Sequence, residues 1–222
     1  MTDRLWEILV SSFVKILIPG IKVTIPLTIT SFALSMVLGV LLAIAQHAGN
    51  KVFNKIAQFY IWIFRGTPVI VQLFIIFFGL GSIGFVIPAF WAATIAFGLN
   101  LAAYNAETIR AAIEAIPKNQ YEAASMSGIS YGQTMRYIIL PQASRIAFPS
   151  LFNNLISLLK DTSLAASITV VDLFTTAQQI AARTYEPFAL YCEAALIYLI
   201  FCTFLTWVQK KIENKLDMMD QR

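Results

Sequence analysis

The sequence predicts an all-α, polytopic membrane protein with five transmembrane helices. Its 222 residues are 58% hydrophobic and 13% charged, with a mean hydropathy of +0.71, so the chain is far more apolar than a soluble domain. The apolar residues form segments long enough to cross about 30 Å of hydrocarbon. A stretch over residues 117–133 separates the third and fourth segments, and it is too polar to span a membrane.

The N-terminal part predicts a surface helix followed by the first span. Residues 1–18 mix polar and apolar side chains, which is typical of an amphipathic helix lying at the membrane surface. Pro19-Gly20 should end that helix, because this pair is a strong chain breaker. The first span is expected over residues 21–46, followed by a short basic loop in which His47 is a solvated residue rather than a metal ligand.

The second and third spans are predicted over residues 56–80 and 88–110. Arg65-Gly66-Thr67-Pro68 interrupts the second. Its first half therefore either lies along the interface or belongs to one helix that is kinked at Pro68. Glu107 and Arg110, near the end of the third span, are three residues apart, a spacing that predicts an ion pair on a helix.

The fourth and fifth spans are expected over residues 138–160 and 185–208. Two prolines should kink the fourth, and residues 161–184 between the spans predict a short helix and a loop outside the core. Glu193 lies within the fifth span. Because a carboxylate at the bilayer centre costs roughly 2.5 to 3.5 kcal/mol, its side chain should face protein or water.

The C-terminal part also contains both cysteines. Cys192 and Cys202 are ten residues apart on one predicted helix, which is about 15 Å by helical rise and too far for a disulfide. We expect them to be packing residues. The chain then ends in a basic amphipathic stretch and a cytoplasmic tail over residues 216–222.

The polar stretch over residues 117–133 carries two helix-start signals with a glycine between them. Asn119 followed three residues later by Glu122 predicts an N-cap with a capping-box acid, and Gly128 predicts a left-handed helix end. Ser130 followed by Gln133 repeats the start signal. The sequence therefore predicts a short helix, a sharp turn and a second helix.

This stretch resembles the Glu-Ala-Ala loop of ABC importer permeases. The matching residues are Glu122, Ala123, Ala124, Gly128, Ile138, Leu140 and Pro141. The resemblance implies a type I ABC importer permease with its transmembrane domain over residues 19–215, in which the loop is a coupling helix that docks into a groove of a cytoplasmic ATPase. Taken singly, Glu122 could merely cap a helix and Gly128 merely end one; their combination at these spacings favours the coupling helix.

Three other runs resemble one branch of that family, the permeases for polar amino acids such as histidine, glutamine, arginine and cystine. They are Arg65-Gly66-Thr67-Pro68 with the residues up to 80, the run at 102–110 and the run at 158–164. The resemblance implies an amino-acid importer subunit of a bacterial cytoplasmic (inner) membrane. Its partners would be two cytoplasmic ATP-binding subunits, a second permease copy or a paralogue, an extracytoplasmic solute-binding protein and membrane lipid.

The motifs that the sequence lacks narrow the class of function. It contains no Gly-x-x-x-x-Gly-Lys-Ser/Thr phosphate loop and no His-Glu-x-x-His zinc motif. We therefore expect no enzyme activity in this chain, no cofactor, no metal and no nucleic-acid partner. Two other classes stay open: a secondary transporter, which usually has more spans and internal repeats, and a structural or assembly membrane protein, which would not need the coupling loop.

The placement of lysine and arginine predicts the orientation. Eleven of the 16 fall on the side of the polar stretch and five on the other. The eleven are Lys51, Lys55, Arg65, Arg110, Lys118, Arg136, Arg145, Lys210, Lys211, Lys215 and Arg222. The polar stretch is therefore expected in the cytoplasm, with the N-terminus outside and the C-terminus inside.

Polar side chains at membrane depth are the candidates for a substrate path, because in lipid they normally face a cavity or another helix. The candidates are Gln72, Asn100, Asn153, Asn154, Ser157 and Asp161. The last three share one helical face. Asp161 could bind an α-ammonium, and a stripe with a single acid favours a zwitterionic polar substrate, such as glutamine or cystine, over arginine or lysine. Alternatively, Asp161 pairs with Lys160 or caps the next helix, and the asparagines hold helices together.

Overall fold

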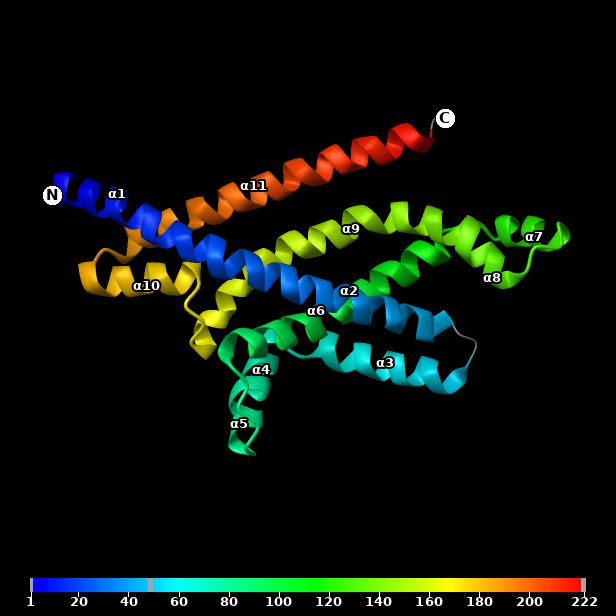
Figure 1. The fold of residues 1–222 in the computed structure, drawn as a ribbon, viewed down its shortest axis with the longest axis horizontal. Coiled ribbons are helices and arrows are strands. Elements are labelled where there is room, and N and C mark those ends of the chain that lie inside the picture. The colour runs from blue at the N-terminus through cyan, green and yellow to red at the C-terminus, as the bar shows by residue number, and fades with distance from the viewer. Residues whose placement is uncertain (1, 48–49, 221–222) are drawn as a thin grey trace.

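The computed structural model describes residues 2–47 and 50–220, and this part of the chain consists of helices and turns without a strand (Figure 1). The helical segments are α1 (Thr2–Pro19), η1 (Gly20–Thr24), α2 (Ile25–His47), α3 (Lys51–Gly66), α4 (Val69–Phe74), η2 (Ile75–Gly79), α5 (Leu80–Ser82), α6 (Ala89–Glu114), α7 (Lys118–Met126), α8 (Tyr131–Thr134), η3 (Met135–Ile139), α9 (Leu140–Asp161), η4 (Thr162–Ile168), α10 (Leu173–Thr184) and α11 (Pro187–Asp220). Segments η1, η2 and η3 are π-helical turns, and η4 is a 3-10 helix. Arg222 and the end of the predicted tail lie outside the described residues.

The first three segments form one long helix, so the break expected at Pro19-Gly20 is wrong. α1 passes through the π-helical turn η1 directly into α2. Pro19 lacks a backbone donor, and the wider turn that follows accommodates this irregularity without ending the helix. A Cβ at Gly20 would lie 3.0 Å from Leu173 and 3.1 Å from Phe201, so close packing against α10 and α11 also keeps the chain in line here.

Residues 56–80 do not form one continuous helix. α3 meets the helix Val69–Ser82 at 102°, so the first half of the expected span is a helix of its own. Pro68 has no backbone N–H, and Thr67 before it is extended, as a residue preceding proline usually is. Gln72 holds the bend, because its Nε2 donates to the carbonyl oxygen of Phe64 (3.1 Å) and to the carbonyl (3.2 Å) and hydroxyl (2.7 Å) oxygens of Thr67.

Residues 161–184 form the expected short helix, α10, but the expectation that they lie outside the core is wrong. Leu173, Ala177 and Ala181 of α10 are buried in one cluster with Ile16 of α1. The cluster also includes buried residues of α11. The helix is short and partly polar, so its composition hides the fact that one of its faces is entirely apolar and covered.

Among the described residues, two helices are long and apolar enough to cross a membrane, Arg4–His47 and Pro187–Leu216. Up to four spans result if each of two bent helix pairs counts as one. The first helix has 44 residues, or about 66 Å by helical rise, so part of it must lie beyond the hydrocarbon. α6, the expected third span, is not among them; it carries Asn100, Asn105 and a charged end. The number of five spans therefore stays a prediction.

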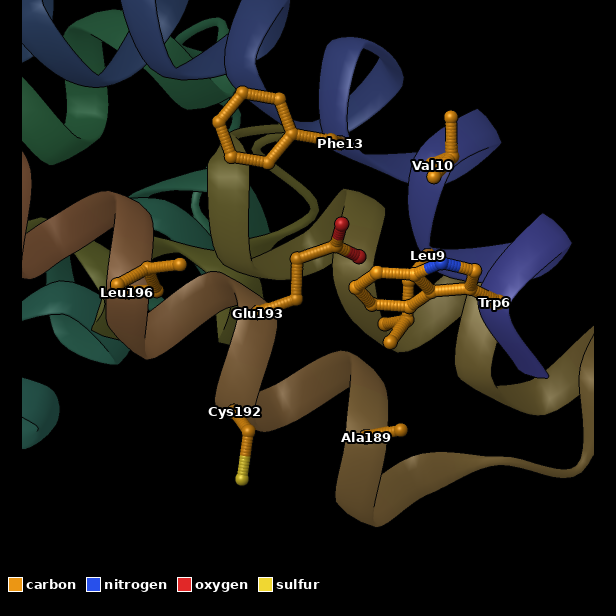
Figure 2. A pocket seen from close by; sticks show the side chains of 8 residues that line it. All are labelled: Trp6, Leu9, Val10, Phe13, Ala189, Cys192, Glu193 and Leu196. Atoms are coloured by element: carbon orange, nitrogen blue, oxygen red, sulfur yellow. The ribbon is translucent and has the colours of Figure 1, made fainter. Parts of the chain in front are cut away.

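A groove separates α1 from α11, and Figure 2 shows the side chains that line it. The α11 residues include Cys192 and Glu193, and those of α1 include Trp6 and Phe13. Glu193 is only 7% exposed, and its carboxylate accepts a hydrogen bond from Ser12 Oγ at 2.5 Å. This confirms that the Glu193 side chain faces protein. Both cysteines of the chain are free.

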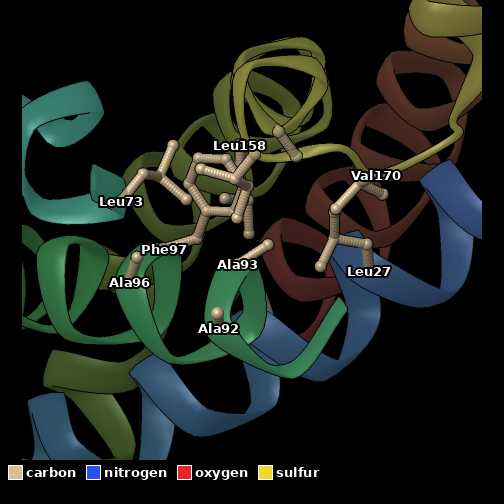
Figure 3. Close-up of a cluster of buried hydrophobic side chains, with 10 residues drawn as sticks. Leu27, Leu73, Ala92, Ala93, Ala96, Phe97, Leu158 and Val170 are labelled. Carbon is tan, nitrogen blue, oxygen red and sulfur yellow. The ribbon is translucent and has the colours of Figure 1, made fainter. Parts of the chain in front are cut away.

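The core that positions the site lies where α2, α4, α6 and α9 meet (Figure 3). Phe97 of α6 is buried there with Leu27, Leu73 and Leu158. α2 and α6 approach closely because a glycine of α2, Gly39, faces the α6 backbone. In lipid, helices associate through such close packing rather than through the hydrophobic effect. The contact of α2 with α6 therefore depends on small residues.

Candidate functional site

Two features of the structure form the candidate site: the polar tip formed by α7 and α8, and a polar cavity between α3, α6 and α9. The tip lies at one end of the molecule, far from the N-terminus (Figure 1). α7 begins at Lys118 with Pro117 as its N-cap, and no side chain caps it. The expected cap by Asn119 is therefore wrong. Pro117 is fixed at φ −58° with an extended ψ of 136° and starts the helix earlier, which places Asn119 inside the first turn.

The end of α7 and the start of α8 confirm two other predictions. Gly128 has φ +72°, the left-handed conformation expected of it. Ile129 N donates to Ala124 O and Gly128 N to Ser125 O, both at 3.0 Å, which is the Schellman pattern of a glycine-terminated helix. Ser130 then caps α8 in a complete capping box with Gln133. The backbone groups at the end of α7 and at the start of α8 are thus hydrogen-bonded by residues of the turn itself.

α7 is fixed to the body of the protein on one face and exposed on the other. Ala124 is buried, whereas Glu122, Ala123 and Gly128 are exposed. Gln120 of α7 and Gln142 of α9 exchange two amide hydrogen bonds, at 3.0 and 2.6 Å. Composition and helix-start signals gave no indication of this pair, because its members are 22 residues apart.

The Ile-x-Leu-Pro end of the loop motif lies where η3 joins α9. Ile138 is half-buried against the cluster at the base of α7, while Leu140 is 44% exposed. Pro141 follows the π-helical turn η3, where the helix that begins at Tyr131 continues into α9. Its missing N–H removes one bond of that helix, and the wider turn before it accommodates the irregularity. The motif therefore places one apolar side chain inward and one outward.

A polar cavity of about 600 Å³ lies beside the bend between α3 and α4. The residues with polar or charged side chains in its lining are Arg65, Thr67, Asn100, Tyr104, Asn154, Ser157 and Asp161. A second cavity of about 470 Å³ shares Arg65, Tyr104 and Asn154 with the first and adds Glu107 and Arg110. The structure thus brings four of the six predicted path residues together, from two different helices.

The predicted stripe on α9 presents unused polar groups to the cavity. Within the described residues, the Asp161 carboxylate makes no hydrogen bond and no ion pair, and it does not cap η4. Thr162 and Ser163 instead donate to the carbonyl oxygens of Leu159 and Lys160. Asp161 therefore neither caps the next helix nor forms a close ion pair with Lys160 in this structure. Its carboxylate is open to a ligand. The other part of that alternative, that the asparagines hold helices together, is confirmed for Asn154 and Asn100, which each form a hydrogen bond to another helix.

Asn154 is oriented from behind by a chain of buried amides. Its Nδ2 donates to Asn105 Oδ1 at 2.9 Å, and Asn105 Nδ2 donates to Ser35 Oγ at 3.0 Å. Asn105 and Ser35 are both completely buried. Because Nδ2 of Asn154 is engaged, its Oδ1 is the group left to accept from a ligand in the cavity.

Gln72 and Asn153, the other two predicted path residues, do not line this cavity. Gln72 is 6% exposed, and its Oε1 accepts from Asn100 Nδ2 at 3.1 Å. Both the oxygen and the nitrogen of its amide are therefore used in hydrogen bonds at the bend between α3 and α4. Asn100 lines the cavity, but its Nδ2 also donates to Phe64 O at 3.0 Å. Asn153 is exposed elsewhere on α9.

Arg65 and Tyr104 are site residues that the sequence analysis missed. The Arg65 guanidinium carbon lies 5.4 Å from the centroid of the Tyr104 ring, a cation–π contact. The sequence analysis named Arg65 only in a family motif and among the cations on the side of the polar stretch, and it included Tyr104 only in the run at 102–110. The predicted ion pair of Glu107 with Arg110 is confirmed at 3.0 Å.

Comparison with known proteins identifies the family. Residues 35–218 match the family described as "Binding-protein-dependent transport system inner membrane component". The chain belongs to this family. This transport-system permease is similar to the L-cystine transport system permease protein TcyB of Bacillus subtilis (strain 168), at 44% identity over 96% of this chain and 91% of that protein.

Two other proteins resemble this permease. The arginine transport system permease protein ArtQ of Bacillus subtilis (strain 168) is 38% identical over 93% of this chain and 95% of its own. A crystal structure of an amino acid ABC transporter with histidines is 33% identical, with a TM-score of 0.88, over 93% of this chain and 96% of that one. The permease thus has the expected type I ABC importer fold and is an inner-membrane transport component. Its family decides against a secondary transporter or an assembly protein.

Proposed function

We propose that this chain is the permease subunit of an ATP-driven importer for polar amino acids, and that α7 couples it to a cytoplasmic ATPase. The observation that carries the proposal is the combination of a rigid polar tip with a polar cavity in one small helical chain. In this proposal the tip contacts the ATPase and the cavity receives the solute. The relatives named for cystine and arginine transport support the substrate class.

α7 has the properties that a docking helix needs. Its inner face is anchored to α9 through the Gln120–Gln142 pair and, through Tyr121, to the buried cluster that contains Ile113 of α6, so a force on the helix reaches α6 and α9. Its outer face ends in Met126, which is 88% exposed. A single exposed apolar side chain is normal on a protein surface, so Met126 is available to a partner but does not by itself indicate one. We assign the docking contact to Glu122, Ala123 and the turn at Gly128.

The assembly that follows contains several subunits. Two ATP-binding subunits would dock on the α7 tips of two permease chains, identical or paralogous, and a solute-binding protein outside the membrane would deliver the amino acid. Closure of the ATPase pair on ATP would move the two α7 tips together. The permease itself would supply the path, and ATP hydrolysis would take place in the other subunits.

The cavity favours a zwitterionic substrate. Asp161 and Asn154 Oδ1 offer acceptors to an α-ammonium, and Arg65 on the opposite wall offers a cation to an α-carboxylate. A volume of about 600 Å³ lies within the range of small-molecule sites. Only one carboxylate lies on the α9 stripe, so a cationic side chain would find no second acid there. We therefore favour glutamine or cystine over arginine and lysine.

The coupling part of the proposal is tested by Gly128→Asp. A side chain at φ +72° is strained by about 1 kcal/mol or more, and the new charge would enter the docking surface. We expect uptake to be lost while membrane insertion and assembly of the permease pair survive. Gly132→Ala is the matched control, since a Cβ there meets no atom within 4 Å. Normal uptake by Gly128→Asp at normal expression would remove the docking assignment.

A further inference from the structure

Arg65 lies between the two polar cavities and belongs to the lining of both. Its side chain is 45% exposed, and its nearest acid is Glu107, with Nη1 to Oε2 at 3.7 Å. That distance is an ion pair but too long for a hydrogen bond. The guanidinium also makes a cation–π contact with the Tyr104 ring. This contact holds the Arg65 side chain between the two cavities but leaves its N–H groups free to change hydrogen-bond partners.

Glu107 is fully engaged without Arg65. Its carboxylate accepts from Arg110 Nε at 3.2 Å and Nη2 at 3.0 Å, and from Gln46 Nε2 at 3.1 Å. Arg110 continues the network to Glu114, with Nη1 to Oε2 at 2.6 Å. The contact with Arg65 is therefore the loosest in the network. Losing it would leave the Glu107 carboxylate paired and hydrogen-bonded.

We propose, resting on the function proposed above, that Arg65 exchanges partners during transport. In the empty cavity it pairs with Glu107, and when an amino acid binds it turns to the α-carboxylate of that amino acid. Substrate binding thus competes with the pair between Arg65 and Glu107. Because a coupling between two contacts is reciprocal, the strength of the pair between Arg65 and Glu107 also sets the affinity of the cavity.

The network that Arg65 leaves ends next to the coupling tip. Glu114 is the last residue of α6, and Pro117, three residues later, is the N-cap of α7. Ile113 of α6 and Ile116, in the short connection to α7, are buried in one cluster with Ile139 at the base of the tip. Arg65 therefore connects the occupancy of the cavity to the helix that leads into α7.

Glu107→Gln tests the exchange, because it removes the competing acid while keeping the size of the side chain. The complex of permease and ATPase in nanodiscs, without the solute-binding protein, is titrated with whichever of L-cystine, L-glutamine and L-arginine it transports, and with the α-amide of that amino acid. We expect Glu107→Gln to bind the amino acid about fivefold more tightly and the α-amide no more tightly. If Glu107 had only a structural role, its replacement would weaken the binding of both the amino acid and the α-amide.

Two further variants make the test specific. Glu114→Gln removes the same charge from the outer end of the network and should leave both affinities unchanged. Arg65→Gln should bind the amino acid and its α-amide within about twofold of each other, and adding Glu107→Gln to it should have no further effect. Unchanged affinity in Glu107→Gln, or the same tightening in the Arg65→Gln background, would overturn the exchange.

The outcome also separates this inference from the proposed function. If the wild-type complex transports an amino acid and only the variants behave otherwise, the exchange fails and the importer assignment stands. If the wild-type complex transports none of the three amino acids, the substrate class itself fails. Copurification of each variant with the ATPase shows that it is folded and assembled.

Discussion

Asn153 and Asn154 are neighbours in the sequence with different surroundings. Asn154 lines both polar cavities and bonds to Asn105, whereas Asn153 is exposed on another side of α9. The helical spacing of Asn154, Ser157 and Asp161 was enough to predict that these three share a face. It could not rank Asn153 against Asn154, since the rotation of α9 is set by contacts with other helices.

The pair provides a matched prediction. Asn154→Leu should reduce uptake about tenfold, because one hydrogen bond of roughly 1 to 1.5 kcal/mol to the substrate is lost. It also leaves Asn105 Oδ1 without its donor, so the thermal stability of the complex should fall slightly. Asn153→Leu makes the same chemical change outside the cavity and should keep wild-type uptake. Equal uptake in both variants, measured at equal expression, would remove the α9 stripe from the substrate path.

Arg65 shows why part of the site escaped prediction. Its motif lies in a stretch that the sequence describes equally well as a kinked span or as two helices. Only the 102° bend brings the arginine opposite the α9 stripe. The bend depends on Gln72 and Asn100, which bond to the backbone across it from residues up to 36 positions away. No local signal encodes such contacts.

At the scale of the elements, the capping signals at Gly128 and Ser130 predicted correctly, whereas the cap at Asn119 and the break at Pro19-Gly20 were wrong. Gly128 and Ser130 behave as expected because each terminates a helix through bonds to residues at most five positions away. Pro19-Gly20 does not break its helix, because η1 is packed against α10 and α11. Tertiary contacts override the preference of a short motif when the helix on both sides is held.

The contact between α2 and α6 gives the prediction at this scale. A Cβ at Gly39 would lie 2.9 Å from Asn105 Cβ and 3.3 Å from the backbone atoms Ala102 O and Ala106 N. A helix backbone cannot move aside cheaply, so Gly39→Ala should destabilise the protein by about 1 to 3 kcal/mol. Displacing Asn105 also disturbs its bond to Asn154, and uptake should fall as well.

Gly81→Ala is the control for Gly39→Ala, because a Cβ at Gly81 meets no atom within 4 Å. Alanine favours a helix over glycine, so this variant should be as stable as the wild type or slightly more stable. Both variants are compared by thermal unfolding of the purified complex in detergent. A Gly39→Ala protein that unfolds at the wild-type temperature would show that α2 and α6 are not held by close backbone contact.

At the scale of the whole molecule, composition predicted a helical membrane protein correctly, while the number of spans depends on how the bent pair of α3 and the helix Val69–Ser82 crosses the bilayer. A right-angle bend suits either a broken span or a segment that returns to the side from which it came. Hydropathy is the same in both cases. The side on which Ser82 lies therefore decides whether this pair forms a span.

Three single-cysteine variants, made in a Cys192→Ala, Cys202→Ala background, locate the two sides of the membrane with an impermeant thiol reagent. Lys118, Gln179 and Ser82 are all exposed, on α7, α10 and α5. The excess of lysine and arginine on the α7 side predicts that this side faces the cytoplasm. Lys118→Cys should therefore react only after the membrane is opened, whereas Gln179→Cys should react in intact cells.

If the α3–α5 segment completes a span, Ser82→Cys should behave like Gln179→Cys. Labelling of Ser82→Cys only in opened cells would show that the α3–α5 segment is re-entrant and would lower the number of spans. A Lys118→Cys protein that reacts in intact cells would reverse the orientation and separate α7 from the compartment that contains ATP.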